Sequence, residues 1–409
     1  MSWLTFAASL TALEMIAAGL TGWLRQSCPW IITDRDLNPP IDPEGLNKFL
    51  AGGWDPELGW VRKPGHAGEE TGVDGQTTKF SIDHRGARLN PGFEERPPEI
   101  LVYGDSYAFA RQVNNDETWS HILSKNLDRH VANFGVGNYG LDQALMRLER
   151  EYHRHPAPLV IMAVVPETLG RVLSVWKHFS EYGNTFAFKP RFELYNDSLN
   201  LIPNPVDKPE IFFHIADLLP ELQKKDLFFE MKFKKDLLRF PYLQHIIQSR
   251  KRNPAILWAA LRDRIRGVSG MDGHAFPLVM ARNISMTAAL YQEQKPVELL
   301  AAITRRFATF VRGHGSEPLL LMMPQLMDLE RIESGDHYYQ PFLVELRKEL
   351  PCIDAATPLL AEEKNRGKLY INDKYGGHLS PLGNRIVAVH TAQRILELQQ
   401  TAATRAVCL

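Results

Sequence analysis

The chain has 409 residues, enough for two or three domains of ordinary size or for one enlarged α/β domain. Its 47 Lys and Arg side chains nearly balance its 48 Asp and Glu side chains, so the overall charge argues against nucleic-acid binding. Hydrophobic residues make up 44% of the chain and charged residues 23%, which excludes a largely disordered protein.

An apolar segment begins the chain at Trp3 and ends near Leu24, and Glu14 is its single charged residue. A helix of this length is ~33 Å long, enough to cross the hydrocarbon core of a bilayer. Glu14 opposes this, because an acidic group near the middle of a membrane helix costs roughly 2.5–3.5 kcal/mol. We favour a single membrane-anchoring helix within residues 1–28. The alternatives are a helix docked on protein or lying in the membrane interface, and a cleaved signal, so a soluble cytoplasmic or an exported chain stays open.

Residues 29–98 are rich in turn-forming Gly and Pro pairs, such as Gly52-Gly53 and Pro97-Pro98. We expect an irregular lead-in that packs on a larger body through its aromatic side chains, not a domain of its own.

Strands and helices alternate from Glu99 onwards, which predicts a parallel sheet with right-handed crossovers. The almost wholly apolar stretch 158–165 is typical of a strand buried on both faces. Expected strands span 100–103, 131–136 and 158–165, and expected helices span 119–127 and 141–153.

The alternation lapses over residues 170–287, which we interpret as a long insertion, and resumes with helices at 288–313, 340–350 and 382–398 and strands at 319–323 and 352–356. Residues 99–400 are therefore predicted to form a three-layer α/β/α sandwich with a five-stranded, mainly parallel sheet.

Two residues at the predicted carboxyl edge of this sheet have the chemistry of acyl transfer. Ser106 follows the first strand in Gly104-Asp105-Ser106, and His378 precedes the last helix. Ligands of parallel sheets bind where strands lead into helices, so the two side chains can meet there as nucleophile and base. Taken alone, Ser106 could equally be a helix N-cap and His378 an ordinary surface histidine.

The surrounding sequence resembles the SGNH (GDSL-type) serine hydrolase family in three blocks that occur in the family's order. They are Ile100–Ser106, Asn133–Gln143 and Gly377–Asn384. The resemblance covers roughly residues 95–170 and 290–400. It implies that Ser106 is the nucleophile and His378 the base, and that backbone amides near the first two blocks bind the oxyanion.

The chain departs from the family pattern at three positions. Asn138 stands where the second block has its oxyanion glycine, and backbone donation survives this change because Asn tolerates a left-handed conformation. Thr168 stands near the place of the third oxyanion donor, an asparagine, and could donate through its hydroxyl. Asp373, five residues before His378, is the nearest candidate for the triad acid; without it the site would work as a Ser–His dyad.

The resemblance implies a carboxylic ester hydrolase that acts on a small ester, an O-acetylated carbohydrate or a lipid through an acyl-enzyme on Ser106. One alternative is an O-acyltransferase that modifies a cell-envelope glycan with the same site, and another is a catalytically lapsed scaffold or binding protein. We expect no cofactor, no metal and no nucleic-acid partner, because no metal-ligand spacing and no phosphate-binding loop occur and the chain has only three cysteines.

A basic stretch lies within the insertion. Residues 224–252 carry nine Lys or Arg against three acidic residues, with aromatic side chains between them. A membrane-surface helix, a wall that binds an anionic substrate and a solvated amphipathic helix all fit this pattern.

Overall fold

The computed structural model describes residues 2–71, 75–371 and 377–407, and the chain divides into two compact units. The unit that we call the N-terminal unit contains Met1–Ala51, Leu173–Lys189 and Pro203–Met286. The sheet unit contains Gly52–Val172, Pro190–Ile202 and Thr287–Leu409. Each unit thus contains part of the predicted lead-in, residues 29–98, and part of the predicted insertion, residues 170–287.

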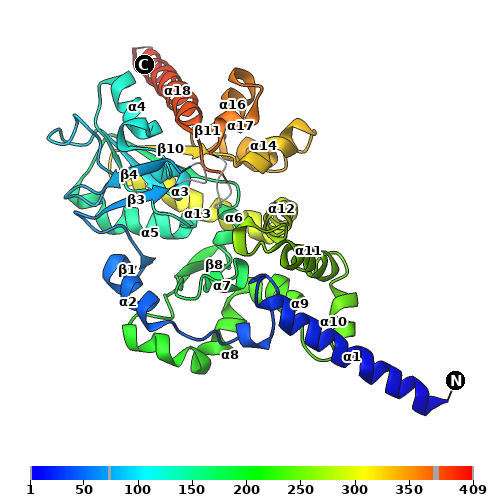
Figure 1. Cartoon of the computed structure of the whole chain (residues 1–409). Helices are drawn as coiled ribbons and strands as arrows, with labels where there is room; N and C mark the ends of the chain where they lie inside the picture. The colour runs from blue at the N-terminus through cyan, green and yellow to red at the C-terminus, as the bar shows by residue number, and fades with distance from the viewer. Residues whose placement is uncertain (1, 72–74, 372–376, 408–409) are drawn as a thin grey trace. The chain divides into compact units, whose positions relative to one another are not determined.

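The sheet unit is built on a five-stranded parallel sheet with the order β11-β10-β7-β5-β6. Figure 1 labels two of these strands, β10 and β11. Numbered along the chain, the sheet has the doubly wound order 2-1-3-4-5, whose switch point lies between β5 and β7. The strands are β5 (Ile100–Gly104), β6 (Val131–Asn133), β7 (Leu159–Val164), β10 (Glu317–Met322) and β11 (Cys352–Asp354). The predicted fold class is confirmed.

Helices cover both faces of this sheet, which explains why its central strands are apolar at nearly every position. One face packs against α4 (Trp119–Leu127), α16 (Ala356–Glu362) and α18 (Pro381–Val407). The opposite face packs against α5 (Leu141–Glu151) and α13 (Gln294–Gly313). All five residues of β5 are buried as a result.

Most of the expected elements occur within a few residues of their predicted bounds. The helix predicted over 288–313 is instead the end of α12 (Ala275–Leu290) and the whole of α13, separated by a short turn. Strand β6 ends at Asn133, three residues before the predicted 136, because the chain leaves the sheet at the second sequence block.

Residues before the first sheet strand are less irregular than their turn-forming residues suggested. Antiparallel pairs form between β1 (Trp54–Asp55) and β2 (Gly59–Trp60) and between β3 (Ala67–Thr71) and β4 (Thr77–Ser81). A further antiparallel pair, β8 (Arg191–Tyr195) and β9 (Ser198–Ile202), belongs to the same unit.

The N-terminal unit is largely helical, with a hydrophobic core that includes Leu24, Trp30, Ile256 and Val279. Its helices are α1 (Trp3–Arg25), α2 (Pro43–Gly52), α7 (Lys177–Ser180), α8 (Ile215–Lys225), α9 (Lys234–Asp236), α10 (Tyr242–Gln248), α11 (Asn253–Arg266) and the first part of α12, with the π-helix η5 (Phe229–Phe233) between α8 and α9. The basic stretch of the sequence lies here, spread over several short helices and their connections.

Helix α1 is long and apolar enough to cross a membrane, with a mean hydropathy of 1.5, and only 11% of its most apolar window is buried. Glu14, the residue that argued against a membrane helix, accepts hydrogen bonds from the backbone N–H groups of Tyr242 (2.6 Å) and Leu243 (3.1 Å). Its carboxylate thereby caps the N-terminus of α10, where a negative charge is stabilised.

Candidate active site

Ser106 lies at the carboxyl end of β5, on the turn that leads into the short helix α3 (Ser106–Phe109). Asp105 is the N-cap of this helix, since its carboxylate accepts the backbone N–H groups of Tyr107 (2.8 Å) and Ala108 (3.4 Å). The alternative in which Ser106 itself caps the helix is therefore wrong, and its hydroxyl is left available for other contacts. As the first residue of the helix, Ser106 also has a backbone N–H without an intrahelical acceptor.

Asp105 joins the turn that carries Ser106 to the neighbouring segments of the sheet edge. Its second carboxylate oxygen accepts the backbone N–H of Val165 (2.9 Å) and a hydrogen bond from Arg171 (3.3 Å). Arg171 also donates to the carbonyl of Tyr139 (3.2 Å) and pairs with Glu167 (2.8 Å). One guanidinium thus ties together the segments that follow β5, β6 and β7, and Asp105 acts as an anchor of the turn.

His378 lies just before α18, and the final sequence block holds it in place through Asn384. The Asn384 side chain accepts the backbone N–H of Trp119 (3.1 Å) and donates to the carbonyl of Leu379 (2.9 Å). The Tyr107 hydroxyl donates to the carbonyl of Gly377 (2.9 Å). The bonds from Trp119 and Tyr107 fix the histidine segment to elements that follow the first strand.

The structure brings Ser106 and His378 together at the sheet edge, with 2.9 Å between Ser106 Oγ and His378 Nε2. On the other side of the imidazole ring, Nδ1 lies 2.8 Å from the side-chain oxygen Oε1 of Gln112. Because Oε1 can only accept, Nδ1 carries the proton and Nε2 is left to accept the Ser106 hydroxyl proton.

The electrostatic surroundings keep the imidazole of His378 neutral. Burial, with smaller contributions from the charges of Arg111 and Arg171, lowers the pKa of His378 from 6.5 to about 3. A neutral imidazole is the form that a general base requires. Cations that disfavour an imidazolium also favour negative charge on a reacting oxygen nearby.

Gln112 reaches His378 from a strained loop. Both Ala110 (φ 57°) and Gln112 (φ 69°) have left-handed backbones, which costs a residue other than glycine roughly 1–2 kcal/mol. The buried guanidinium of Arg88 holds this loop by donating to the carbonyls of Phe109, Ala110 and Val113. Strain that the surroundings enforce in this way is typical of functional sites.

Three glycines, one in each sequence block, allow the segments of the site to approach closely. A Cβ on Gly104 would lie 1.8 Å from the carbonyl oxygen of Ala163, and one on Gly135 would lie 2.4 Å from the backbone nitrogen of Phe109. A Cβ on Gly383 would lie 2.4 Å from the carbonyl oxygen of Leu369. Each of these distances is too short for any other residue without movement of the backbone.

The two residues expected to help bind the oxyanion have different surroundings. Asn138 is exposed and has a left-handed backbone (φ 67°), a conformation that Asn tolerates. Thr168 is fully buried at the start of α6 (Thr168–Arg171), and its hydroxyl oxygen accepts the backbone N–H of Leu141 (2.9 Å). That bond gives Thr168 a structural role at the N-terminus of α5; its role as an oxyanion donor stays a prediction.

Asp373, the expected triad acid, lies outside the described residues. The partner of His378 Nδ1 that the structure does describe is Gln112, which sequence reasoning missed. Its amide carries no charge and stands 266 positions from the histidine, so neither charge nor spacing pointed to it. Its place only six residues after Ser106 is the one local signal.

Within residues 2–71, 75–371 and 377–407, no group of three or more His, Cys, Asp or Glu side chains is arranged to hold a metal ion.

No protein-family model and no curated protein matches the sequence. Among solved structures, the chain is similar to a protein assigned to the lipolytic G-D-S-L family from Desulfitobacterium hafniense DCB-2, with 10% identity and a TM-score of 0.32 over 72% of this chain and 97% of that one. It is also similar to a G-D-S-L family lipolytic protein from Veillonella parvula DSM 2008, with 9% identity and a TM-score of 0.32 over 71% and 93% of the two chains.

The sheet topology brings the three sequence blocks to the place where the sequence predicted a site. The sheet has the doubly wound order, and all three blocks meet at its carboxyl edge, with Ser106 after the first strand and His378 before the last helix. The sheet unit of this chain is an α/β domain with a five-stranded parallel sheet, and its topology is consistent with an SGNH (GDSL)-like fold.

Proposed function

We propose that this chain is a serine-dependent esterase with Ser106 as nucleophile and His378 as general base. The observation that carries the proposal is the 2.9 Å contact between Ser106 Oγ and His378 Nε2, with Nδ1 engaged by Gln112 on the opposite side of the ring. A hydroxyl, a neutral imidazole and a group that orients the imidazole are the parts that nucleophilic acyl transfer needs.

In the first half of the proposed reaction, Ser106 Oγ bonds to the acyl carbon of the ester and its proton passes to His378 Nε2. The tetrahedral intermediate then expels the alcohol, which takes the proton from His378 and leaves the acyl group on Ser106. In the second half, water attacks the acyl carbon and gives a proton to His378. The carboxylic acid leaves as that proton returns to Ser106 Oγ.

The oxyanion of both intermediates needs hydrogen-bond donors in place before the reaction. The backbone N–H of Ser106, free of an intrahelical acceptor, and the backbone N–H of Asn138 are the proposed donors, with the Thr168 hydroxyl as a third. The charges of Arg111 and Arg171, which lower the pKa of His378, act in the same direction.

The group that orients the imidazole in this proposed site, the side chain of Gln112, is a neutral amide. An amide fixes the imidazole tautomer as a carboxylate does, but it does not stabilise the imidazolium that forms during the reaction. We therefore expect a slower enzyme than one with a carboxylate in this place.

The substrate that we propose is a small carboxylic ester, such as an O-acetylated carbohydrate or a lipid. Helix α1 exposes a row of large apolar side chains and is long enough to cross a membrane, which supports attachment of the chain to a membrane. The same helix favours the second candidate, an O-acyltransferase that passes the acyl group from Ser106 to the hydroxyl of a cell-envelope glycan.

Hydrolysis of p-nitrophenyl acetate by the purified full-length chain tests the proposal. We expect turnover by the native protein and a loss of at least about 10³-fold in both Ser106→Ala and His378→Ala, since the two groups act as a unit. Ser334→Ala, which alters an exposed serine in the same unit, is the matched control and should keep full activity.

Release of acetate separates the two candidate activities. Free acetate formed without an acceptor supports the hydrolase, whereas acetylated glycan formed at the expense of acetate supports the transferase. Absence of p-nitrophenol release across acetyl, butyryl and octanoyl esters, together with full folding of the protein, would contradict both activities and favour a catalytically lapsed scaffold.

A further inference from the structure

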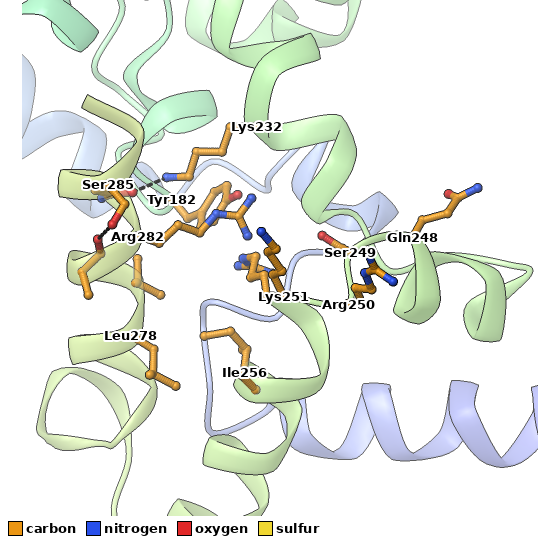
Figure 2. Close-up of a pocket in the computed structure, with 15 residues that line it drawn as sticks. Tyr182, Lys232, Gln248, Ser249, Arg250, Lys251, Ile256, Leu278, Arg282 and Ser285 are labelled. Atoms are coloured by element: carbon orange, nitrogen blue, oxygen red, sulfur yellow. Dashed lines mark hydrogen bonds between the residues drawn. The ribbon is translucent and has the colours of Figure 1, made fainter. Parts of the chain in front are cut away.

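A basic cavity of about 590 Å³ lies within the N-terminal unit, and its lining includes neither Ser106 nor His378. Figure 2 shows residues from η5, from α12 and from the connection between α10 and α11 drawn around this one space. Five of its 15 lining residues are cations: Lys232, Arg250, Lys251, Arg252 and Arg282.

The carboxylate of Asp236 forms ion pairs with two of these cations. It pairs with Arg252 Nε at 3.2 Å and with Arg282 Nη2 at 2.9 Å, and it also accepts the hydroxyl of Tyr182. The side chain of Asp236 is fully buried. This carboxylate holds the two guanidinium groups in place without balancing both of their charges.

Lys232 adds a buried positive charge to the cavity. The residue is only 2% exposed, and its ammonium donates to the carbonyl of Ser180 and to the side-chain oxygen of Asn283 (2.8 Å). Both acceptors are neutral. Burial lowers the pKa of Lys232 to about 8, although the charges of Asp236 and Glu181 act in the opposite direction. An anion in the cavity would stabilise the charged form of this side chain.

Arg250 and Lys251 extend the positive charge to the mouth of the cavity. Both side chains are exposed on the connection between α10 and α11, and neither forms an ion pair with any of the residues that the structure describes. These two side chains are therefore available to a ligand, and replacing them should not disturb the fold.

Part of the remaining wall is apolar and connects the cavity to α1, and the rest of it includes the polar residues Gln248, Ser249, Asn283 and Ser285. Ile256, Leu278 and Val279 line the apolar part. Ile256 and Val279 also belong to the hydrophobic cluster that contains Leu24 near the end of α1. If α1 crosses a membrane, its C-terminal end lies near the level of the lipid headgroups, and the cavity shares a hydrophobic core with that end.

We propose that this cavity binds a phosphate group carried by an amphiphilic ligand, with Lys232, Lys251 and Arg282 around the phosphate and the apolar wall against the rest of the molecule. Arg and Lys side chains in excess of carboxylates are the usual means of holding phosphate. The phosphate has two sources that share this chemistry, a soluble phosphate ester and the headgroup of an anionic membrane phospholipid, whose phosphate is not neutralised by a cation of the lipid itself. The proposal is independent of the esterase assignment.

The test uses the full-length chain in two arms. In the first, flotation compares binding to vesicles of pure phosphatidylcholine with binding to vesicles that contain one part phosphatidylglycerol in five. In the second, calorimetry measures binding of glycerol 3-phosphate to the detergent-solubilised chain. Binding in the first arm alone identifies the lipid headgroup as the source, and binding in the second identifies the phosphate ester itself; either result supports the site.

The double variant Arg250→Ala/Lys251→Ala should weaken the anion-dependent binding at least about tenfold, since each cation near an anionic surface contributes roughly a fivefold factor. Its melting temperature without ligand should match that of the native protein. The control variant Lys224→Ala/Lys235→Ala removes two exposed lysines of the same unit that do not line the cavity, and it should bind as the native protein does.

Two results would overturn the proposal. One is equal binding of the native chain to both kinds of vesicle with no binding of glycerol 3-phosphate. The other is an equal loss in the control and cavity variants, which would show that general surface charge, screened by salt, accounts for the binding.

Discussion

Replacing Gln112 probes the least expected contact of the site. In Gln112→Ala the His378 Nδ1–H loses its acceptor at 2.8 Å, and a buried polar group without a partner costs about 1–3 kcal/mol. If that cost raises the activation free energy of the reaction by the same amount, kcat for p-nitrophenyl acetate should decrease roughly 5- to 150-fold with little change in KM.

Gln112→Glu has the same shape as the native side chain and adds a charge. A carboxylate at this distance favours the imidazolium and should raise the pKa of His378 from about 3 by roughly 1–3 units. The acid limb of the profile of kcat/KM against pH should therefore move towards higher pH in this variant. In the native enzyme the same limb should lie well below 6.5.

The reading of Gln112 as the group that orients His378 would be refuted by two results together. One is Gln112→Ala with kcat within twofold of native; the other is Gln112→Glu with an unchanged acid limb. A loss of kcat that is accompanied by unfolding at the assay temperature would show a structural role, so both variants are compared by melting temperature as well.

Three further predictions concern the support of the site. Gly135→Ala places a Cβ 2.4 Å from the Phe109 nitrogen and should destabilise the fold by about 1–3 kcal/mol, measured by urea denaturation; an unchanged midpoint would contradict the close approach. Arg88→Met leaves carbonyls of the strained loop without donors and should lower the free energy of unfolding by about 3 kcal/mol or more in the same assay. A stability equal to the native one would show that the loop keeps its conformation without Arg88. Because the pKa of His378 is depressed, the unfolded chain binds an extra proton between pH 6.5 and about 3, so stability falls as pH decreases, by about 2 kcal/mol at pH 5 from this group. The variant His378→Asn should lose that part of the pH dependence. If its free energy of unfolding changes with pH as steeply as that of the native protein, the pKa of His378 is not lowered in the folded chain.

The sheet was predictable because its physical causes are local. A strand buried on both faces needs an apolar run, and helices between such runs need periodic apolar residues, so β5, β7 and β10 are recognisable without tertiary information. The shared placement of Ser106 and His378 follows from the same topology, since the carboxyl ends of parallel strands meet at one edge.

The other parts of the molecule depend on contacts between distant residues. Arg88, in the predicted lead-in, fixes the loop that carries Gln112, and no local pattern indicates such a bond. Glu14 counted against a membrane helix in the sequence, but its carboxylate caps α10 more than 200 residues later in the chain. Short helices in the N-terminal unit likewise gain their stability from packing rather than from their own propensity.

The most direct test of the proposed esterase is the site of covalent modification by a fluorophosphonate, mapped by peptide mass spectrometry on the native chain. We expect one adduct, on Ser106, with labelling abolished in Ser106→Ala and strongly slowed in His378→Ala. An adduct on any other serine, or labelling of Ser106→Ala at the native rate, would contradict the assignment of the nucleophile and with it the proposed function.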